Sequence, residues 1–294
     1  EMVIRDWSSD VCSSDLIMGI GLGVGYLTPV KNLMLWFSDN KGLATGIAVA
    51  GFGLAKAIAS PLMEYLIGTV GLVNMFFILA VIYAVMMFFG FLLIKRPADW
   101  VYDPATSHVS RAEILRKPVF WGIWIAFYIN ITCGLALISQ EKDILHDVLK
   151  AFPQYAGLSP AKFAAAIAGI IGLVLAVDSV FNTAGRVGFS TLSDHLKRRE
   201  TVYQVIFIMS IAVCLLQIFT NSINNALLWA VLAMLFLINA GYGGGFSTLP
   251  VLLDQHFGTK TVSTTHGLAL SAWAFAGLSD RKSTRLNSSH ESPS

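Results

Sequence analysis

Three polar residues with complementary chemistry, Asp178, Asn182 and Arg186, follow one another at intervals of four in an otherwise apolar stretch. On a helix this spacing puts them on one face, turned by about 40° at each step, with Asp178 about 12 Å from Arg186 along the axis. The guanidinium of arginine keeps its charge and presents a planar fork that matches a carboxylate. The spacing therefore predicts an anion site anchored by Arg186, with Asn182 as a hydrogen-bonding neighbour.

Two roles stay open for each charged member of this set. Arg186 either contacts a bound anion directly or belongs to an ion-pair network with Asp194. Asp178 is either a structural charge partner or a carboxylate that couples proton uptake to the site. Ionisable residues inside apolar segments are costly, which makes them functional candidates by default.

Further side chains are candidates for the same site. Lys56 either supplies a second cation to the site, or it forms an ion pair within the bundle or is hydrated in the cavity. The aromatic residues Tyr26, Tyr242 and Phe246 either line a central cavity or pack in the core. His266 is either a titrating group or an interfacial residue, and the second is the expectation here.

The segment GRVGFSTLSDHLKRR at 185–199 ends an expected helix with an acid followed by bases. Asp194 at the helix end can hold Arg198 or Arg199, and breaking such a pair would accompany the opening of that end of the molecule. We therefore expect Asp194, Arg198 and Arg199 to form a gate. The same basic cluster also fixes the orientation of the chain in a membrane.

Residues for catalysis or metal binding do not come together in the sequence. The histidines lack metal-ligand spacing, no Ser/His/Asp set falls on one face, and the cysteines predict no disulfide framework. The G-x-G-x-G at 21–25 lacks the preceding strand of a dinucleotide site, and its small residues favour close helix packing instead. The formal net charge of +2 is too small to indicate nucleic acid. The sequence predicts no enzyme, no metal site and no cofactor.

The elements that must position these residues are long apolar blocks. Hydrophobic residues make up 55% of the chain and charged residues 13%, with a mean hydropathy of +0.66. Soluble domains carry about a quarter charged residues, and blocks of about 20 apolar residues match a bilayer core. The pattern predicts an all-α, multi-pass integral membrane protein with eight spans: 17–37, 43–67, 72–94, 119–139, 164–192, 202–219, 226–253 and 264–278.

Basic residues gather in alternate connections between these spans. The richer set is Lys41, Lys95, Arg96, Arg111, Arg116, Lys117, Lys197, Arg198, Arg199 and Lys260. The positive-inside rule places this set in the cytoplasm, so the first span runs inwards and an odd number of helices is expected to precede it. The connection 95–118 divides a bundle at 17–94 from a second bundle at 119–278.

An internal repeat relates the first and seventh spans. GLGVGYLTPV at 21–30 aligns with GYGGGFSTLP at 241–250 at a constant offset of 220, so Tyr26 corresponds to Phe246. Both spans run in the same direction. A parallel repeat is typical of transporters whose halves are related by an axis along the membrane normal.

The two ends differ from the rest in composition. Residues 10–16 read DVCSSDL and residues 280–290 read DRKSTRLNSSH, and the chain turns from apolar to Ser-rich and charged near Leu278. Both stretches resemble translated sequencing-adapter oligonucleotides. We therefore expect 1–16 and 279–294 to be artefacts outside the fold.

The apolar blocks resemble the major facilitator superfamily, and within it the oxalate/formate antiporter group. GxGxGYxxP from Gly21, then WF, then KGLATGIAVAGFG at 41–53 resemble the fourth and fifth helices of that group. The segments 118–139 and 182–199 resemble the seventh and eighth helices. GYGGGFSTLP, FGTK and HGLALSAWAFAGL resemble the tenth and eleventh. The resemblance spans 17–278 and implies helices four to eleven of twelve.

The resemblance implies a secondary transporter of small carboxylates that works by alternating access, as an antiporter or coupled to protons. Arg186 matches an arginine with which the group's oxalate carrier binds its substrate. That carrier also uses a lysine in its eleventh helix, where Trp273 stands in this chain. The difference favours a monocarboxylate over a dianion such as oxalate.

The expected partners are a small organic anion, the lipid bilayer and protons, with no nucleic acid. We expect a monomer in the cytoplasmic membrane of a bacterium. The alternative is a non-transporting membrane sensor built on the same fold.

Overall fold

The computed structural model describes residues 21, 25–98, 110–155, 157–220 and 225–279. Every regular element in these ranges is helical. The elements are a helix over 25–36, α2 (Lys41–Val70), α3 (Leu72–Leu93), α4 (Arg111–Arg116), α5 (Pro118–Lys150), the 3-10 helix η2 (Pro153–Tyr155), α6 (Pro160–His195), α7 (Thr201–Phe219), α8 (Asn225–Phe257), α9 (Val262–Ala269) and a helix over 271–279. The predicted all-α fold is confirmed, and helix is found in each of the eight expected spans.

Five of these helices, α3, α5, α6, α7 and α8, are long and apolar enough to cross a membrane. In α3 only Met75 and Leu79 are buried, whereas Phe91 and Leu93 each expose more than three quarters of their surface. A helix that is apolar all round and unburied by protein is stable in lipid but not in water. The chain is therefore an integral, multi-pass membrane protein, as predicted.

Helix extends beyond several of the predicted boundaries, and furthest at the end of α5. α5 continues to Lys150, although the expected span ended at 139, because Leu145 and Leu149 lie one turn apart and pack against α6 and α8. A hydropathy window averages these leucines with the charged residues between them and so misses the amphipathic extension. The last span begins earlier than expected, at Val262, and is interrupted by a turn at Leu270.

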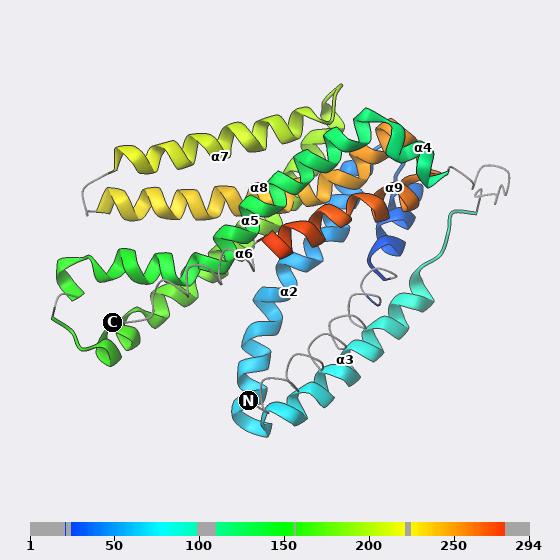
Figure 1. Cartoon of the computed structure of the whole chain (residues 1–294). Coiled ribbons are helices and arrows are strands. Elements are labelled where there is room, and N and C mark those ends of the chain that lie inside the picture. The colour runs from blue at the N-terminus through cyan, green and yellow to red at the C-terminus, as the bar shows by residue number, and fades with distance from the viewer. Residues whose placement is uncertain (1–20, 22–24, 99–109, 156, 221–224, 280–294) are drawn as a thin grey trace, which may run out of the picture.

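α6 lies between α2 and α8 and packs closely against both of them (Figure 1). Small residues make this approach possible. A Cβ at Gly46 or Gly53 of α2 would clash with Ser190 or Thr183 of α6. On the other side, a Cβ at Gly243 of α8 would meet the carbonyl oxygen of Asn182 at 2.5 Å. Glycine stripes thus bring three backbones together around the polar face of α6.

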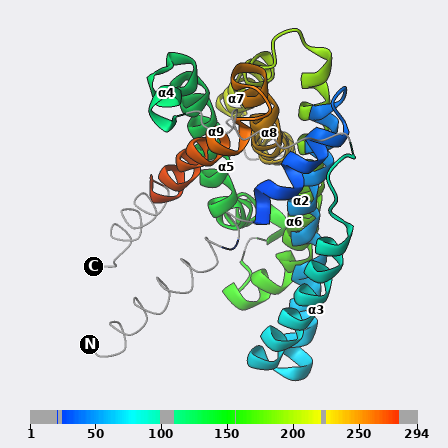
Figure 2. The same cartoon turned by 90° about the vertical axis from the view of Figure 1, so that its right-hand side faces the viewer.

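The helices converge at one end, which we call the basic end because Lys41, Lys117, Arg199 and Lys260 lie there. Gly53 of α2 still packs on α6, whereas further along α2 Ile58 and Tyr65 each expose 68% of their surface. From there the α2–α3 hairpin diverges from α5 and α6 (Figure 1). Figure 2, which views the molecule from the side of α4 and α9, places α3 at its margin.

Candidate functional site

Arg186 lies in the middle of the bundle, with 6% of its surface exposed. Its guanidinium carbon is 6.0 Å from the ring centroid of Phe52 on α2 and 5.4 Å from that of Phe246 on α8. Aromatic faces stabilise a cation at such distances. A buried cation is therefore held where α2, α6 and α8 meet.

The hydrogen bonds of Arg186 leave part of its guanidinium unused. Its Nε donates to Asn182 Oδ1 at 2.8 Å, and its Nη1 is buried without a partner among the described residues. No acidic side chain in that part of the chain forms an ion pair with it. The guanidinium therefore retains N–H groups that can donate hydrogen bonds to a carboxylate oxygen.

A directed chain of side-chain hydrogen bonds leads from Arg186 to Asp178. Asn182 accepts from Arg186 and donates its Nδ2 to Asn239 Oδ1 at 2.8 Å. Asn239 in turn donates its Nδ2 to Asp178 Oδ2. All four side chains are buried. The predicted face of α6 thus forms one polar network, which Asn239 of α8 completes.

An aromatic cluster covers this network. Phe246 contacts the rings of Tyr26 at 5.8 Å, Phe127 at 5.6 Å and Trp273 at 5.5 Å. Tyr26 also meets Phe52 at 5.4 Å, so it touches both rings that hold Arg186. The two repeat-related aromatics, Tyr26 and Phe246, therefore lie against each other next to the buried cation.

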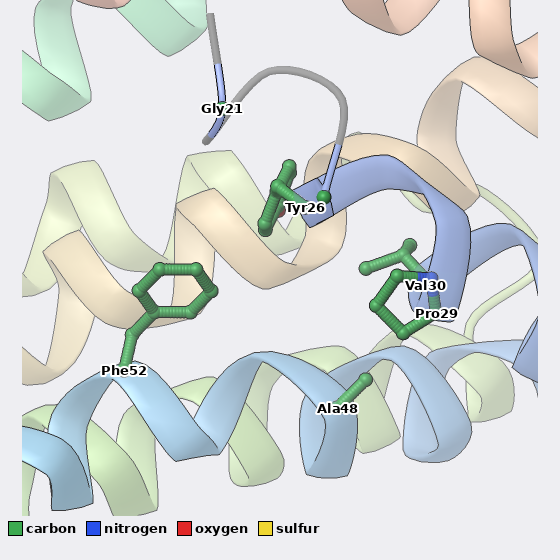
Figure 3. A pocket seen from close by; sticks show the side chains of 7 residues that line it. Gly21, Tyr26, Pro29, Val30, Ala48 and Phe52 are labelled. Carbon is green, nitrogen blue, oxygen red and sulfur yellow. The ribbon is translucent and has the colours of Figure 1, made fainter. Parts of the chain in front are cut away.

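A pocket of about 250 Å³ opens beside this cluster (Figure 3). Phe52 and Ala48 rise from α2 on one side, and Tyr26 and Pro29 face them from the 25–36 helix. Gly21 and Gly25 also line the pocket, and no other described atom would lie within 4 Å of a Cβ at either position. The expected helix contact of this glycine pair is therefore not found among the described residues, whereas their repeat counterparts Gly241 and Gly245 do pack closely.

The remaining predicted site residues are distributed as follows. Tyr242 is largely buried, and its ring lies against Gly134 of α5. The side chain of Lys56 lies outside the described part of the chain.

His266 is completely buried, which corrects the expectation of an interfacial position. The correction has a simple cause: α9 begins at Val262, a full turn before His266, so this residue already lies inside the bundle.

The basic end is closed by contacts between the two predicted bundles. Asp194 of α6 accepts hydrogen bonds from the backbone N–H groups of Gly42 and Leu43, both at 2.9 Å. These groups lie in the first turn of α2, where the helix dipole favours an anion. Arg199 also contacts Asp194 at 2.9 Å, whereas Arg198 pairs with Glu200.

A second contact at this end joins Lys41 to α8. The Nζ of Lys41 lies 2.8 Å from Asp254 Oδ2 and 3.0 Å from Thr259 Oγ1. Both members of the ion pair are largely buried, with 19% and 12% of their side chains exposed. The sequence placed Lys41 in a connection but gave no reason to pair it with a residue 213 positions away.

Sequence reasoning missed three residues of the site: Phe52, Asn239 and Phe127. Asn239 carried a usable signal, since it is an amide two residues before the repeated glycine motif and inside an apolar span. Phe52 and Phe127 carried none, because phenylalanine is common in every span. No group of three or more His, Cys, Asp or Glu side chains in the described ranges could hold a metal ion.

A multi-pass helical bundle with a buried cation between its two halves is the architecture of a membrane transporter. The model of the Major Facilitator Superfamily matches residues 13–279, so the chain belongs to this superfamily. Membership confirms the predicted family, which is a superfamily of transporters and not of enzymes.

Curated relatives refine this assignment. The chain is 27% identical over 262 residues to the MFS-type transporter YhjX of Escherichia coli (strain K12), covering 87% of this chain and 60% of the relative. It is 24% identical over 266 residues to the oxalate:formate antiporter of Oxalobacter formigenes, covering 89% and 59%. It is 21% identical over 346 residues to the apicoplast pyruvate carrier 1 of Toxoplasma gondii, covering 95% and 60%. The chain spans about three fifths of the length of these relatives.

Proposed function

We propose that the protein carries small carboxylates across the membrane by alternating access, with Arg186 as the anchor of the solute. The observation that carries this proposal is the buried guanidinium whose Nη1 has no partner among the described residues. If an acidic side chain held Arg186, the charge would already be balanced. It is instead bound by a neutral amide and two aromatic rings, which leaves its charge for an anion.

A monocarboxylate suits this site better than a dicarboxylate. Arg186 is the only lysine or arginine that is buried among the side chains the structure describes. Trp273, the residue expected to replace a second cation, lies against Phe246. Two of the relatives are named for oxalate, formate and pyruvate. One fixed charge balances one carboxylate, which favours formate-like or pyruvate-like solutes.

The contacts at the basic end support a gate. The positive-inside rule assigns this end to the cytoplasm. Asp194 on the first turn of α2 and Lys41 on Asp254 then close the cytoplasmic side, while the α2–α3 hairpin diverges from α5 and α6 at the other end. Rupture of these two contacts would open Arg186 to the cytoplasm. Arg198, which is exposed and paired with Glu200, has no comparable contact with the other bundle in the described residues.

Asp178 is our candidate for proton coupling. The amides of Asn182 and Asn239 separate its carboxylate from Arg186 and transmit the interaction between the two charges. An anion bound at Arg186 weakens the hold of this cation on Asp178, which makes uptake of a proton easier. Exchange of one carboxylate for another and symport with a proton both remain open on this scheme. We further propose that the protein acts as a monomer in a bacterial cytoplasmic membrane.

The test is uptake of labelled formate, pyruvate, lactate and oxalate into proteoliposomes that hold the full-length protein. Replacing a charge-assisted hydrogen bond costs roughly 1.5–3 kcal/mol, so Arg186→Ala is expected to lower transport at least about tenfold. Arg186→Lys retains the charge without the planar fork, so its transport rate should lie between those of Arg186→Ala and the unmodified protein. Unchanged flux in Arg186→Ala would defeat the anchor assignment. Tight binding of a carboxylate without flux in the unmodified protein would favour a sensor instead.

A further inference from the structure

A second set of unpaired polar atoms lies near Arg186 and is not used by the site described above. His266 of α9 has 0% of its surface exposed, and neither of its ring nitrogens has a hydrogen-bond partner among the described residues. Buried polar groups are almost always paired, and an exception calls for an explanation such as a ligand or a water. A neutral imidazole offers one donor and one acceptor.

Tyr26 supplies the neighbour of this histidine. The two rings meet edge to face, with centroids 5.6 Å apart, and the Tyr26 hydroxyl is also buried without a described partner. Tyr26 comes from the first predicted bundle and His266 from the second. Three buried polar atoms without a described partner therefore lie on two contacting rings, one from each predicted bundle.

This place extends from the depth of Arg186 towards the basic end. His266 is four residues from the start of α9, a rise of about 6 Å, whereas Arg186 is eight residues from Asp194, a rise of about 12 Å. Tyr26 lies at the depth of Arg186, since it is ten residues from Trp36, a rise of about 15 Å, and contacts Phe52 and Phe246, the two rings that hold Arg186. A solute that leaves Arg186 for the basic end would meet the Tyr26–His266 pair next.

We propose that Tyr26 and His266 form a second docking position for the carboxylate, occupied as the solute passes between Arg186 and the basic end. This inference rests on the proposed function. The phenol O–H and one imidazole N–H both donate to a carboxylate oxygen and carry no net charge. Neutral donors bind an anion more weakly than a guanidinium does, which suits a position from which the solute must depart.

The test compares transport from the two sides of the membrane. Labelled formate and pyruvate are presented to right-side-out and inside-out vesicles that hold the full-length protein. Tyr26→Phe and His266→Phe keep the rings and remove the polar atoms. Each should raise KM for the solute on the cytoplasmic face by about five- to tenfold. KM on the outer face should change less than about twofold.

Controls separate this inference from a structural role and from the proposed function. Thr265→Val changes a fully buried neighbour whose hydroxyl is already bound to the backbone of α9, and it should leave both KM values unchanged. His266→Phe should not lower the thermal stability, since it removes unpaired atoms. Arg186→Gln should raise KM on both faces, and its failure to do so would refute the proposed function. If Arg186→Gln behaves as expected while the two Phe variants act equally on both faces, or on neither, only the second docking position is overturned.

Discussion

At the scale of single residues, the site depends on a cation whose neighbours are neutral. Asn182 orients Arg186 by accepting from its Nε at 2.8 Å, while Phe52 and Phe246 cover its faces. This arrangement fixes the position of the guanidinium without balancing its charge. The attraction of the site for an anion follows from that imbalance.

Asn182→Asp tests this reasoning by placing a carboxylate on Arg186 in the position of the amide oxygen. The new ion pair competes with the solute, so KM for formate or pyruvate should rise at least about tenfold. The melting temperature should stay the same or fall, because the second carboxylate oxygen would face the acceptor Oδ1 of Asn239. Asn182→Ala removes the hydrogen bond without adding a competitor and should raise KM less, by about two- to fivefold. A larger effect of alanine than of aspartate would contradict the account.

The sequence was informative about this network because its spacing was regular. Steps of four placed Asp178, Asn182 and Arg186 on one face of α6, and the structure has all three in one hydrogen-bonded chain. The sequence could not identify Asn239 as the link, because that requires knowing which turn of α8 faces α6. It also could not predict that His266 is buried, since the start of α9 depends on the turn at Gly258–Thr261.

At the scale of elements, the glycine stripes set the distance between α2, α6 and α8. Gly243 is the clearest case, because a Cβ there would meet the Asn182 carbonyl at 2.5 Å and the Cγ of Arg186 at 3.0 Å. Both atoms belong to the helix that carries the site. Spacing between these helices and the position of the cation are therefore linked.

Gly243→Ala should consequently weaken both stability and solute binding. Overpacking costs about 1–3 kcal/mol, which predicts a melting temperature several degrees lower and a KM for formate or pyruvate raised about five- to tenfold. The matched control is Gly188→Ala on α6, where no described atom lies within 4 Å of the added carbon. Equal effects of the two substitutions would contradict a packing role specific to Gly243.

The predicted elements were accurate where hydropathy is uniform and wrong where it changes along a helix. α3, in which only Met75 and Leu79 are buried, matches its predicted span of 72–94 within one residue at each end. α5 exceeds its predicted span because its polar extension carries buried leucines. Tertiary packing, which no window of local hydropathy contains, decides such ends.

At the scale of the whole molecule, alternating access requires that the closed basic end can open again. The contacts of Lys41 with Asp254 and of Asp194 with the first turn of α2 join the two bundles at this end. Both are electrostatic and lie at the end of the bundle, outside its apolar core. Such contacts can break without disturbing the apolar core.

A charge reversal tests this gate. Lys41→Asp opposes two carboxylates and should favour the open state by roughly 1–2 kcal/mol, about a tenfold shift in population. The reporter is Thr45→Cys, a fully buried position on α2, labelled from the cytoplasmic side in a background without other cysteines. Lys41→Asp should accelerate labelling about tenfold, and adding Asp254→Lys should return the rate to the starting value. If neither substitution changes the labelling rate, Lys41 and Asp254 are not part of the gate.

The proposed function depends on binding of the solute carboxylate by the guanidinium of Arg186. The most direct measurement is the affinity of the purified full-length protein for formate and pyruvate by titration calorimetry, with and without Arg186→Gln. Loss of the charged fork should weaken binding of the better of these ligands by roughly ten- to a hundredfold while the protein remains folded. An unchanged dissociation constant in a folded Arg186→Gln protein would contradict the account.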